Sequence, residues 1–247
     1  MSRNRCILSA VLALTLSLPA CGGGGGGGGD GGGGGSAPQF TTLFEDSFDS
    51  LSGSKWTFAG QGNAVHDPAR GFPTAGSLKI DGATVATARA GSFSADGGLQ
   101  IYVRVHLPPN TVANPSQVTS GLMISIESTE LGTGRAELGL FRQHCGGNYG
   151  TRFDYTITAG LGSGNTLQFE ELGCASVPDA RFIDFAFIVW PDGSSEWRRD
   201  NVTVLSFGEH FGTGGVRLKL SAGGNGTVVG LPGWSVWYDD VLVVKPN

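Results

Sequence analysis

The sequence predicts an all-β fold, an antiparallel β-sandwich or jelly roll, that follows a signal peptide and a disordered glycine-rich linker. Apolar and polar residues alternate with a period of two through most of residues 38–247. Residues 38–247 contain no convincing stretch with apolar residues at the three- and four-residue spacing of an amphipathic helix. Turn dipeptides and dispersed glycines separate many short strand-like segments, as in sandwiches and jelly rolls.

The first twenty residues have the order of a secretory signal. Arg3 and Arg5 precede an apolar stretch from Ile7 to Leu18, and small residues follow. The apolar stretch is too short to span a bilayer comfortably, and no later stretch has 18 uninterrupted apolar residues. We therefore expect residues 1–20 to be an export signal rather than a transmembrane helix.

Leu18, Pro19, Ala20 and Cys21 resemble the lipobox of bacterial lipoproteins. The resemblance implies cleavage before Cys21, acylation of this cysteine, and a lipid anchor in the membrane. Gly22 stands where the family's inner-membrane retention signal is usually an aspartate, which implies an outer membrane lipoprotein of the bacterial cell envelope. An ordinary cleaved signal with an incidental cysteine is the alternative.

The segment 21–37 is predicted to be a flexible linker, and residues 38–247 a single β domain. Glycine occupies thirteen of the fourteen positions from 22 to 35. Glycine has no side chain to bury and loses the most backbone entropy on ordering, so this tract cannot pack.

The charge excludes one class of partner. The formal net charge is −5, and removal of residues 1–20 takes away two arginines and no acidic residue. An acidic, lysine-poor chain is a poor partner for nucleic acid, because phosphates require basic patches. A large acidic substrate is disfavoured for the same reason.

Cys145 and Cys174 are the two cysteines that remain outside the signal and the lipobox. An even pair in an exported protein predicts a disulfide. A metal pair is the weaker alternative, because no histidine or further cysteine stands at ligand spacing from both.

Individual strands can be placed from the alternation. Strands are predicted in "LQIYVRVHL" (99–107), "GLMISIES" (121–128), "RFDYTIT" (152–158) and "GVRLKLS" (215–221). In the second of these, Leu122, Ile124 and Ile126 are expected on one face. The more continuously apolar "FIDFAFIVW" (182–190) is expected at the centre of a sheet. Asp81-Gly82 and Asp192-Gly193 are predicted to be hairpin turns.

Three stretches resemble the concanavalin A-like lectin/glucanase superfamily. "LFEDSFDSLSGSKWT" (43–57) and "WSVWYDDVLVV" (234–244) look like its opening and closing strands, and "FIVWPDGSSEWRRDN" (187–201) is similar to the late hairpin of laminin-G-like members. The resemblance implies a jelly roll whose first and last strands lie side by side, which would bring Asp46 near Asp239.

A structural calcium ion is one implication of this resemblance. Asp239 stands among apolar residues and is expected on the same face as Trp237, Val241 and Val243, so its carboxylate needs compensation. In similar sandwiches an aspartate at this position joins backbone carbonyls around calcium, here with Asp46 nearby. The alternative is that Asp239 and Asp240 accept hydrogen bonds from the backbone or from an arginine.

No catalytic residues are predicted. The glucanase branch uses E-x-D-x-x-E or E-x-D-x-E on one strand. "ESTE" (127–130) has the wrong spacing and lacks the aspartate. "GRAELGLFRQH" (134–144) partly echoes the alginate-lyase branch through Arg135, Glu137, Gln143 and His144, which we interpret as a coincidental polar face. The protein is therefore not expected to be an enzyme.

The remaining function is recognition. Tyr102, Arg104 and His106 would project together from one strand face, and Trp197 and Trp234 follow turns, so these residues are candidate contacts for a polysaccharide or envelope glycan. The alternatives are a structural or interaction module of the envelope that binds no glycan, and a divergent polysaccharide hydrolase or lyase.

Overall fold

The architecture is described from a computed structural model of the chain. It describes residues 39–60, 62–72, 76–82, 84–89, 91–107, 118–129, 134–145, 148–158, 165–171, 182–208, 211, 214–222 and 235–247. Every regular element in these ranges is a β-strand. None of the described residues belongs to a helix long and apolar enough to cross a membrane.

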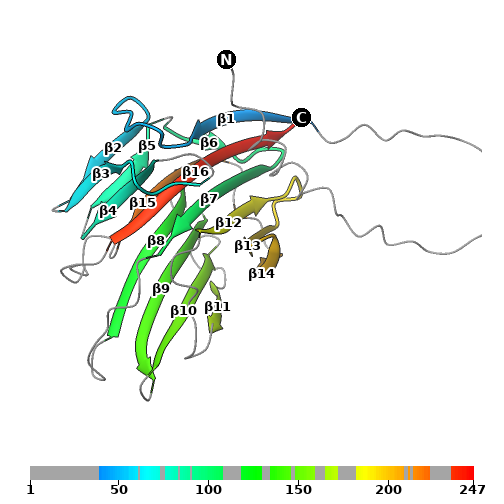
Figure 1. Cartoon of the computed structure of the whole chain (residues 1–247). Helices are drawn as coiled ribbons and strands as arrows, with labels where there is room; N and C mark the ends of the chain where they lie inside the picture. The colour runs from blue at the N-terminus through cyan, green and yellow to red at the C-terminus, as the bar shows by residue number, and fades with distance from the viewer. Residues whose placement is uncertain are drawn as a thin grey trace, which may run out of the picture.

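The strands form two antiparallel sheets, which confirms the predicted sandwich (Figure 1). The first sheet, named sheet A, has eight strands, and β1 pairs with β16 beside the main path. The order along the main path is β14 (Val202–Phe207), β13 (Ser195–Arg199), β12 (Phe182–Val189), β7 (Leu99–His106), β16 (Ser235–Pro246), β4 (Ser77–Asp81) and β3 (Asn63–Asp67).

The second sheet, named sheet B, also has eight strands, and the short strand β6 (Phe93–Ser94) pairs with β15 beside the main path. Its order is β11 (Asn165–Glu171), β10 (Asn148–Thr158), β9 (Arg135–Cys145), β8 (Val118–Ser128), β15 (Gly215–Ser221), β5 (Val85–Ala88) and β2 (Trp56–Ala59).

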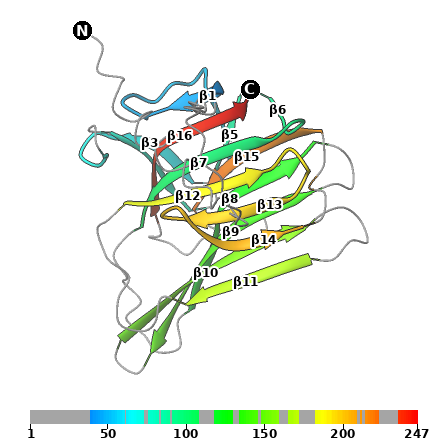
Figure 2. The ribbon, with the colours of Figure 1, turned by 90° about the vertical axis from the view of Figure 1, so that its right-hand side faces the viewer.

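The first and last strands lie side by side, as the resemblance implied. β1 (Phe40–Asp46) pairs with β16 from Phe40 opposite Pro246 to Asp46 opposite Val241. Figure 2 shows β16 between β1 and β7. Asp46 then fixes the chain as it leaves β1, because its carboxylate accepts hydrogen bonds from the Phe48 N–H at 3.1 Å and the Trp56 Nε1–H at 2.7 Å.

The strand predictions for residues 99–107, 121–128, 152–158, 182–190 and 215–221 are confirmed. β12 lies inside sheet A between β13 and β7, as its apolar sequence predicted. Asp192-Gly193 joins the paired strands β12 and β13. The hairpin predicted at Asp81-Gly82 is wrong, because β4 belongs to sheet A and β5 to sheet B. The turn there carries the chain from one sheet to the other.

A β-bulge changes the predicted alternation in β8. The register shifts between Leu122 and Ile124, and the adjacent Met123 and Ile124 are both fully buried. Leu122 was expected on the core face, but it is half-buried. The extra residue of a bulge reverses which side chains face the core on one side of it.

A second bulge lies in β16. The register shifts between Asp239 and Val241, and Asp240 between them has a φ of 45°. Val241 and Val243 belong to the core. Trp237 does not, and its ring contacts Arg70 and His106 on the opposite, outer face. The expectation that Asp239 shares a face with Val241 and Val243 is therefore wrong, because the bulge intervenes.

The core fills the space between the sheets. Its largest fully buried side chains include Trp56, Trp197, Tyr155, Tyr238, Phe185 and Phe187. The hydroxyl of Tyr238, on β16 of sheet A, lies within hydrogen-bond distance of the carbonyl oxygens of Met123 and Ser221 on sheet B, which share its one proton. Burial of this much aromatic surface is the main contribution that holds the sheets face to face.

Candidate functional site

The outer face of sheet B carries a compact group of charged side chains. The alternation in β8, β9 and β15 turns Ile126, Leu138 and Leu218 into the core, so their strand neighbours point outward. The register pairs Ser125 with Glu137 and with Lys219, and Glu127 with Arg135. Two glutamates from neighbouring strands therefore lie on one face, in what we call the Glu127–Glu137 site, completed by Arg135 and Lys219.

The two glutamates share one guanidinium group. Glu137 Oε1 lies 2.5 Å from Arg135 Nη2, and Glu127 Oε1 lies 3.7 Å from the same nitrogen. Glu127 is also held by Lys219 Nζ at 2.5 Å from its Oε2, and it accepts a hydrogen bond from the Ser125 hydroxyl at 3.3 Å. The side chains of Glu127 and Glu137 are 27% and 26% exposed, although the Oε1 atom of Glu137 is itself buried.

The surroundings shift the two pKa values in opposite directions. Burial, with a smaller contribution from the Glu127 charge, raises the pKa of Glu137 despite the opposing effect of Arg135. Burial also acts to raise the pKa of Glu127, but Lys219, Arg135 and Ser125 together outweigh it and lower that pKa. A carboxyl group that tends to keep its proton thus lies beside one that tends to lose it, as in acid–base catalysis.

The sequence contains the parts of this site but does not show that they meet. Along a single strand, Glu127 in "ESTE" has the wrong spacing for the glucanase motif, and Arg135 and Glu137 form only a polar face. The pairing of β8 with β9 brings them together, and a search for spacing along one strand does not detect a pair across two strands. The alternation of both segments could be read from the sequence, whereas the register between the two strands could not.

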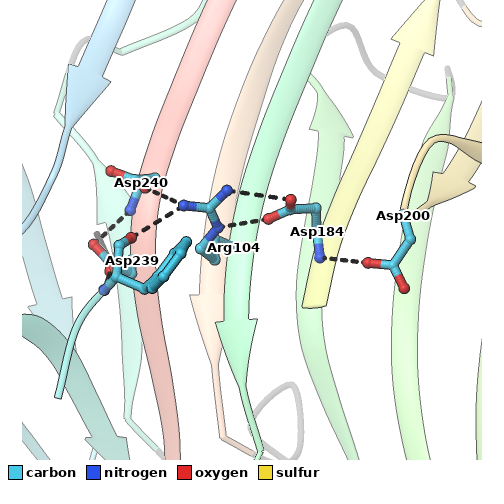
Figure 3. A network of polar contacts seen from close by, with 6 residues as sticks. Arg104, Asp184, Asp200, Asp239 and Asp240 are labelled. Atoms are coloured by element: carbon cyan, nitrogen blue, oxygen red, sulfur yellow. Dashed lines mark hydrogen bonds and ion pairs between the residues drawn. The ribbon is translucent and has the colours of Figure 1, made fainter. Parts of the chain in front are cut away.

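A second polar network lies on the outer face of sheet A (Figure 3). Arg104, on β7, binds Asp184 of β12 through two hydrogen bonds, from Nε at 2.7 Å and from Nη2 at 3.2 Å. On its other side, Nη1 donates to Asp240 Oδ2 at 2.7 Å. The Asp184 N–H in turn donates to Asp200 Oδ1 at 3.3 Å. Figure 3 shows Arg104 between the two carboxylates that it binds.

Asp239 and Asp46 do not face a common site. Asp239 is fully buried and accepts hydrogen bonds from the Phe72 N–H at 2.6 Å and the Asp240 N–H at 2.9 Å. Asp46 points to the Trp56 side of β1, and Asp239 points to the outer face of sheet A. The described residues contain no group of three or more metal-ligating side chains. Both carboxylates are compensated by hydrogen-bond donors of the protein, and the calcium ion stays a prediction.

Tyr102, Arg104 and His106 do project from one face of β7, as predicted, but all three have partners within the protein. The Tyr102 hydroxyl donates to Gln100 Oε1 at 2.5 Å, and burial raises the pKa of Tyr102 to about 12. His106 is 6% exposed and contacts Arg70, with 3.3 Å between His106 Nδ1 and Arg70 Nη1. Their role as ligand contacts stays a prediction.

Trp197 is a core residue, so its prediction as a solvent-facing ligand contact is wrong. It is 1% exposed, and its ring packs on Phe187 and Tyr155 at centroid distances of 5.1 and 6.3 Å. The alternation of β13 turns it inward, toward sheet B. Trp234, Cys21 and Cys174 lie outside the described residues, as does the side chain of Cys145.

The buried aspartates predict a pH dependence of stability. Burial raises the pKa of Asp239 from 3.8 to about 7, and burial also raises that of Asp240 to about 6. Between pH 4 and pH 7 the folded protein therefore retains a proton that the unfolded chain has lost, so stability falls as pH rises. We expect the free energy of unfolding of the wild type to fall by about 2 kcal/mol more than that of Asp239→Asn between pH 5 and pH 8.

Urea denaturation at several pH values measures this difference. Comparison with the variant cancels the titration of groups that both proteins share. Parallel curves for the two proteins would show that Asp239 titrates in the folded protein as it does in the unfolded chain.

Comparison with known proteins places the fold. No protein-family model matches the sequence, and no curated protein matches it. Among solved structures, the chain is similar to the κ-carrageenase of Pseudoalteromonas carrageenovora in complex with an oligotetrasaccharide of κ-carrageenan, at 12% identity and a TM-score of 0.52, with 86% of this chain and 97% of that chain covered.

Two further solved structures are similar over nearly their whole length. An endo-1,3-β-glucanase from Streptomyces sioyaensis shares 15% identity at a TM-score of 0.52, with 83% of this chain and 96% of that chain covered. β-Agarase A from Zobellia galactanivorans shares 11% identity at a TM-score of 0.54, with 86% and 94% covered. The likeness confirms the jelly-roll β-sandwich fold.

The expectation that the protein is not an enzyme is wrong. It rested on the absence of one glutamate–aspartate spacing from individual strands. The three similar structures are polysaccharide-degrading enzymes by name, so this fold does carry such enzymes. The same fold can carry its acidic residues at other positions, and a missing motif does not exclude activity.

Proposed function

We propose that the protein binds a polysaccharide on the outer face of sheet B and hydrolyses its glycosidic bonds at the Glu127–Glu137 site. We further propose that a lipid on Cys21 holds it at the outer membrane of the bacterial envelope. The observation that carries the catalytic proposal is the pair of partly exposed glutamates on one guanidinium, with pKa values shifted apart. The order of signal, lipobox and glycine linker supports the anchor.

In the proposed reaction Glu137 is the acid. It gives its proton to the bridging oxygen as the bond from that oxygen to the anomeric carbon breaks. Glu127, kept ionised by Lys219 and Arg135, attacks the anomeric carbon and forms a glycosyl ester. Water then hydrolyses the ester, and the proton of the water returns to Glu137.

The spacing of the carboxylates favours this double displacement. Because the two oxygens lie 2.5 and 3.7 Å from one nitrogen, they are no more than about 6 Å apart. Retaining glycosidases have separations of about 5–5.5 Å, whereas inverting ones need about 6.5–9.5 Å to admit a water molecule. We therefore expect retention of configuration at the anomeric carbon.

Release of reducing ends tests the proposal, with agarose, κ-carrageenan, β-1,3-glucan, alginate and peptidoglycan as substrates. We expect wild-type protein to cleave at least one of them, and Glu137→Gln to lower the rate about 100-fold or more while binding of the same polysaccharide persists. Glu45→Gln, at an exposed position on β1, is the matched control and should leave the rate unchanged. Absence of cleavage by the wild type, or full activity of Glu137→Gln, would refute the proposal.

A further inference from the structure

The outer face of sheet A exposes an aromatic ring beside the Arg104 network. Phe72 is 58% exposed, although most large apolar side chains in the described residues are buried. A single exposed apolar residue is ordinary in a soluble protein. What sets Phe72 apart is how firmly its position is determined and which polar groups surround it.

The backbone of Phe72 is held on both sides. Its N–H donates to the buried Asp239 carboxylate at 2.6 Å, and its carbonyl oxygen accepts from Arg104 Nη1 at 3.0 Å. The Phe72 ring stacks on Phe182 with 6.5 Å between centroids and 29° between planes. A ring that is already ordered loses little conformational entropy when a ligand packs against it.

An oriented carboxylate accompanies the aromatic rings. Asp184 is two residues after Phe182 on β12, and its side chain is 49% exposed while Arg104 binds both of its oxygens. The Arg104 guanidinium carbon also lies 5.5 Å from the centroid of the Phe72 ring. Arg104 thus positions both the ring and the carboxylate from beneath, since its own side chain is only 16% exposed.

We propose that Phe72, Phe182 and Asp184 form a second binding site, for an uncharged sugar ring. The C–H face of a pyranose packs on an aromatic ring, and its hydroxyl groups donate to a fixed carboxylate. The charge of the site selects against acidic sugars. Arg104 already binds Asp184 and Asp240, and Asp239 lies next to them, so three carboxylates surround one guanidinium.

This site is separate from the proposed catalytic one. It belongs to sheet A, and the Glu127–Glu137 site belongs to sheet B, on the other side of the core. A glycan chain held here would stay near the enzyme without passing through the reaction. The inference therefore stands whether or not the protein hydrolyses polysaccharides.

An NMR titration tests the second site, with the backbone amides of Phe182 and Asp184 as its reporters and that of Glu137 as the reporter for sheet B. The probes are the neutral cellohexaose, laminarihexaose and agarohexaose, and the acidic hexagalacturonate. To prevent cleavage, the protein carries Glu137→Gln. We expect at least one neutral hexasaccharide to shift the Phe182 and Asp184 signals, and Phe72→Ala to weaken that binding at least about tenfold.

Two variants serve as controls. Phe72→Tyr keeps the ring and should bind within about twofold of the parent. Val202→Ala removes another exposed apolar side chain, on β14, and should change nothing. The proposal is overturned if no neutral hexasaccharide shifts the Phe182 and Asp184 signals or if Phe72→Ala binds as the parent does. It is also overturned if hexagalacturonate binds as well as the neutral hexasaccharides. Failure of the catalytic proposal would appear instead as missing reducing-end release, so the two results are distinguishable.

Discussion

Replacement of Arg104 by alanine is expected to lower the free energy of unfolding by about 3 kcal/mol at pH 8. The loss arises because Asp240, with a side chain 10% exposed, would stay in its buried position without a cation. Asp184 contributes less, since it is 49% exposed and water can solvate it. The Phe72 carbonyl would also lose its donor.

The size of this loss should depend on pH. Arg104 lowers the pKa of Asp240, so its removal raises that pKa above the value of about 6 in the wild type. At pH 5 the carboxyl group of the variant takes up a proton and no longer needs a cation. We therefore expect the destabilisation to be smaller at pH 5 than at pH 8, as measured by urea denaturation.

Arg217→Ala provides the control for loss of a surface arginine. Arg217 is exposed on β15, and its replacement should change stability by no more than about 0.5 kcal/mol. An Arg104→Ala protein as stable as this control at pH 8 would show that the network makes no net contribution to folding.

Trp197→Ala should cost about 3–5 kcal/mol of stability. The indole is 1% exposed and lies between Phe187 of sheet A and Tyr155 of sheet B. Its removal would leave a cavity that the two sheets can close only in part. Thermal or urea unfolding of the purified variant measures the effect, and any loss of glycan binding by this variant would reflect unfolding.

Trp197→Phe separates packing from hydrogen bonding. It keeps an aromatic ring in the core but removes the Nε1–H that donates to the Thr156 carbonyl at 3.2 Å. We expect a loss of about 1–2 kcal/mol for this variant. A change of less than about 1 kcal/mol for Trp197→Ala would mean that the ring is not part of the core.

The fold was largely predictable from local patterns. Alternation in residues 99–107 correctly placed Tyr102 and Arg104 on one face of the strand, and Ile101 and Val103 are buried on the other. The pattern fails where one residue is inserted, as at Asp240, because a bulge leaves no distinct signal in composition. The prediction for Trp197 is wrong because a position soon after a turn does not make a side chain exposed, and the alternation of β13 turns this ring inward.

The candidate site was much less predictable. Its residues come from β8, β9 and β15, and Lys219 is far along the chain from Glu127, which it binds. Strand register across a sheet decides which charged side chains are neighbours, and the pKa shifts of Glu127 and Glu137 depend on those neighbours. The second binding site, at Phe72, was equally hard to predict, because only tertiary contacts bring this loop residue to Asp239 and Arg104.

The pairing of β1 with β16 also has a mechanical consequence. The Asn247 N–H donates to the Gln39 carbonyl at 3.0 Å, so the two ends of the domain meet at one corner of the sandwich. A pull on the residues before Gln39 would load the ladder between β1 and β16, and β16 also pairs with β7 and β4. Tension would thus spread into the middle of sheet A. The adjacent ends also make the domain suited to circular permutation, with a short peptide joining residue 247 to residue 39.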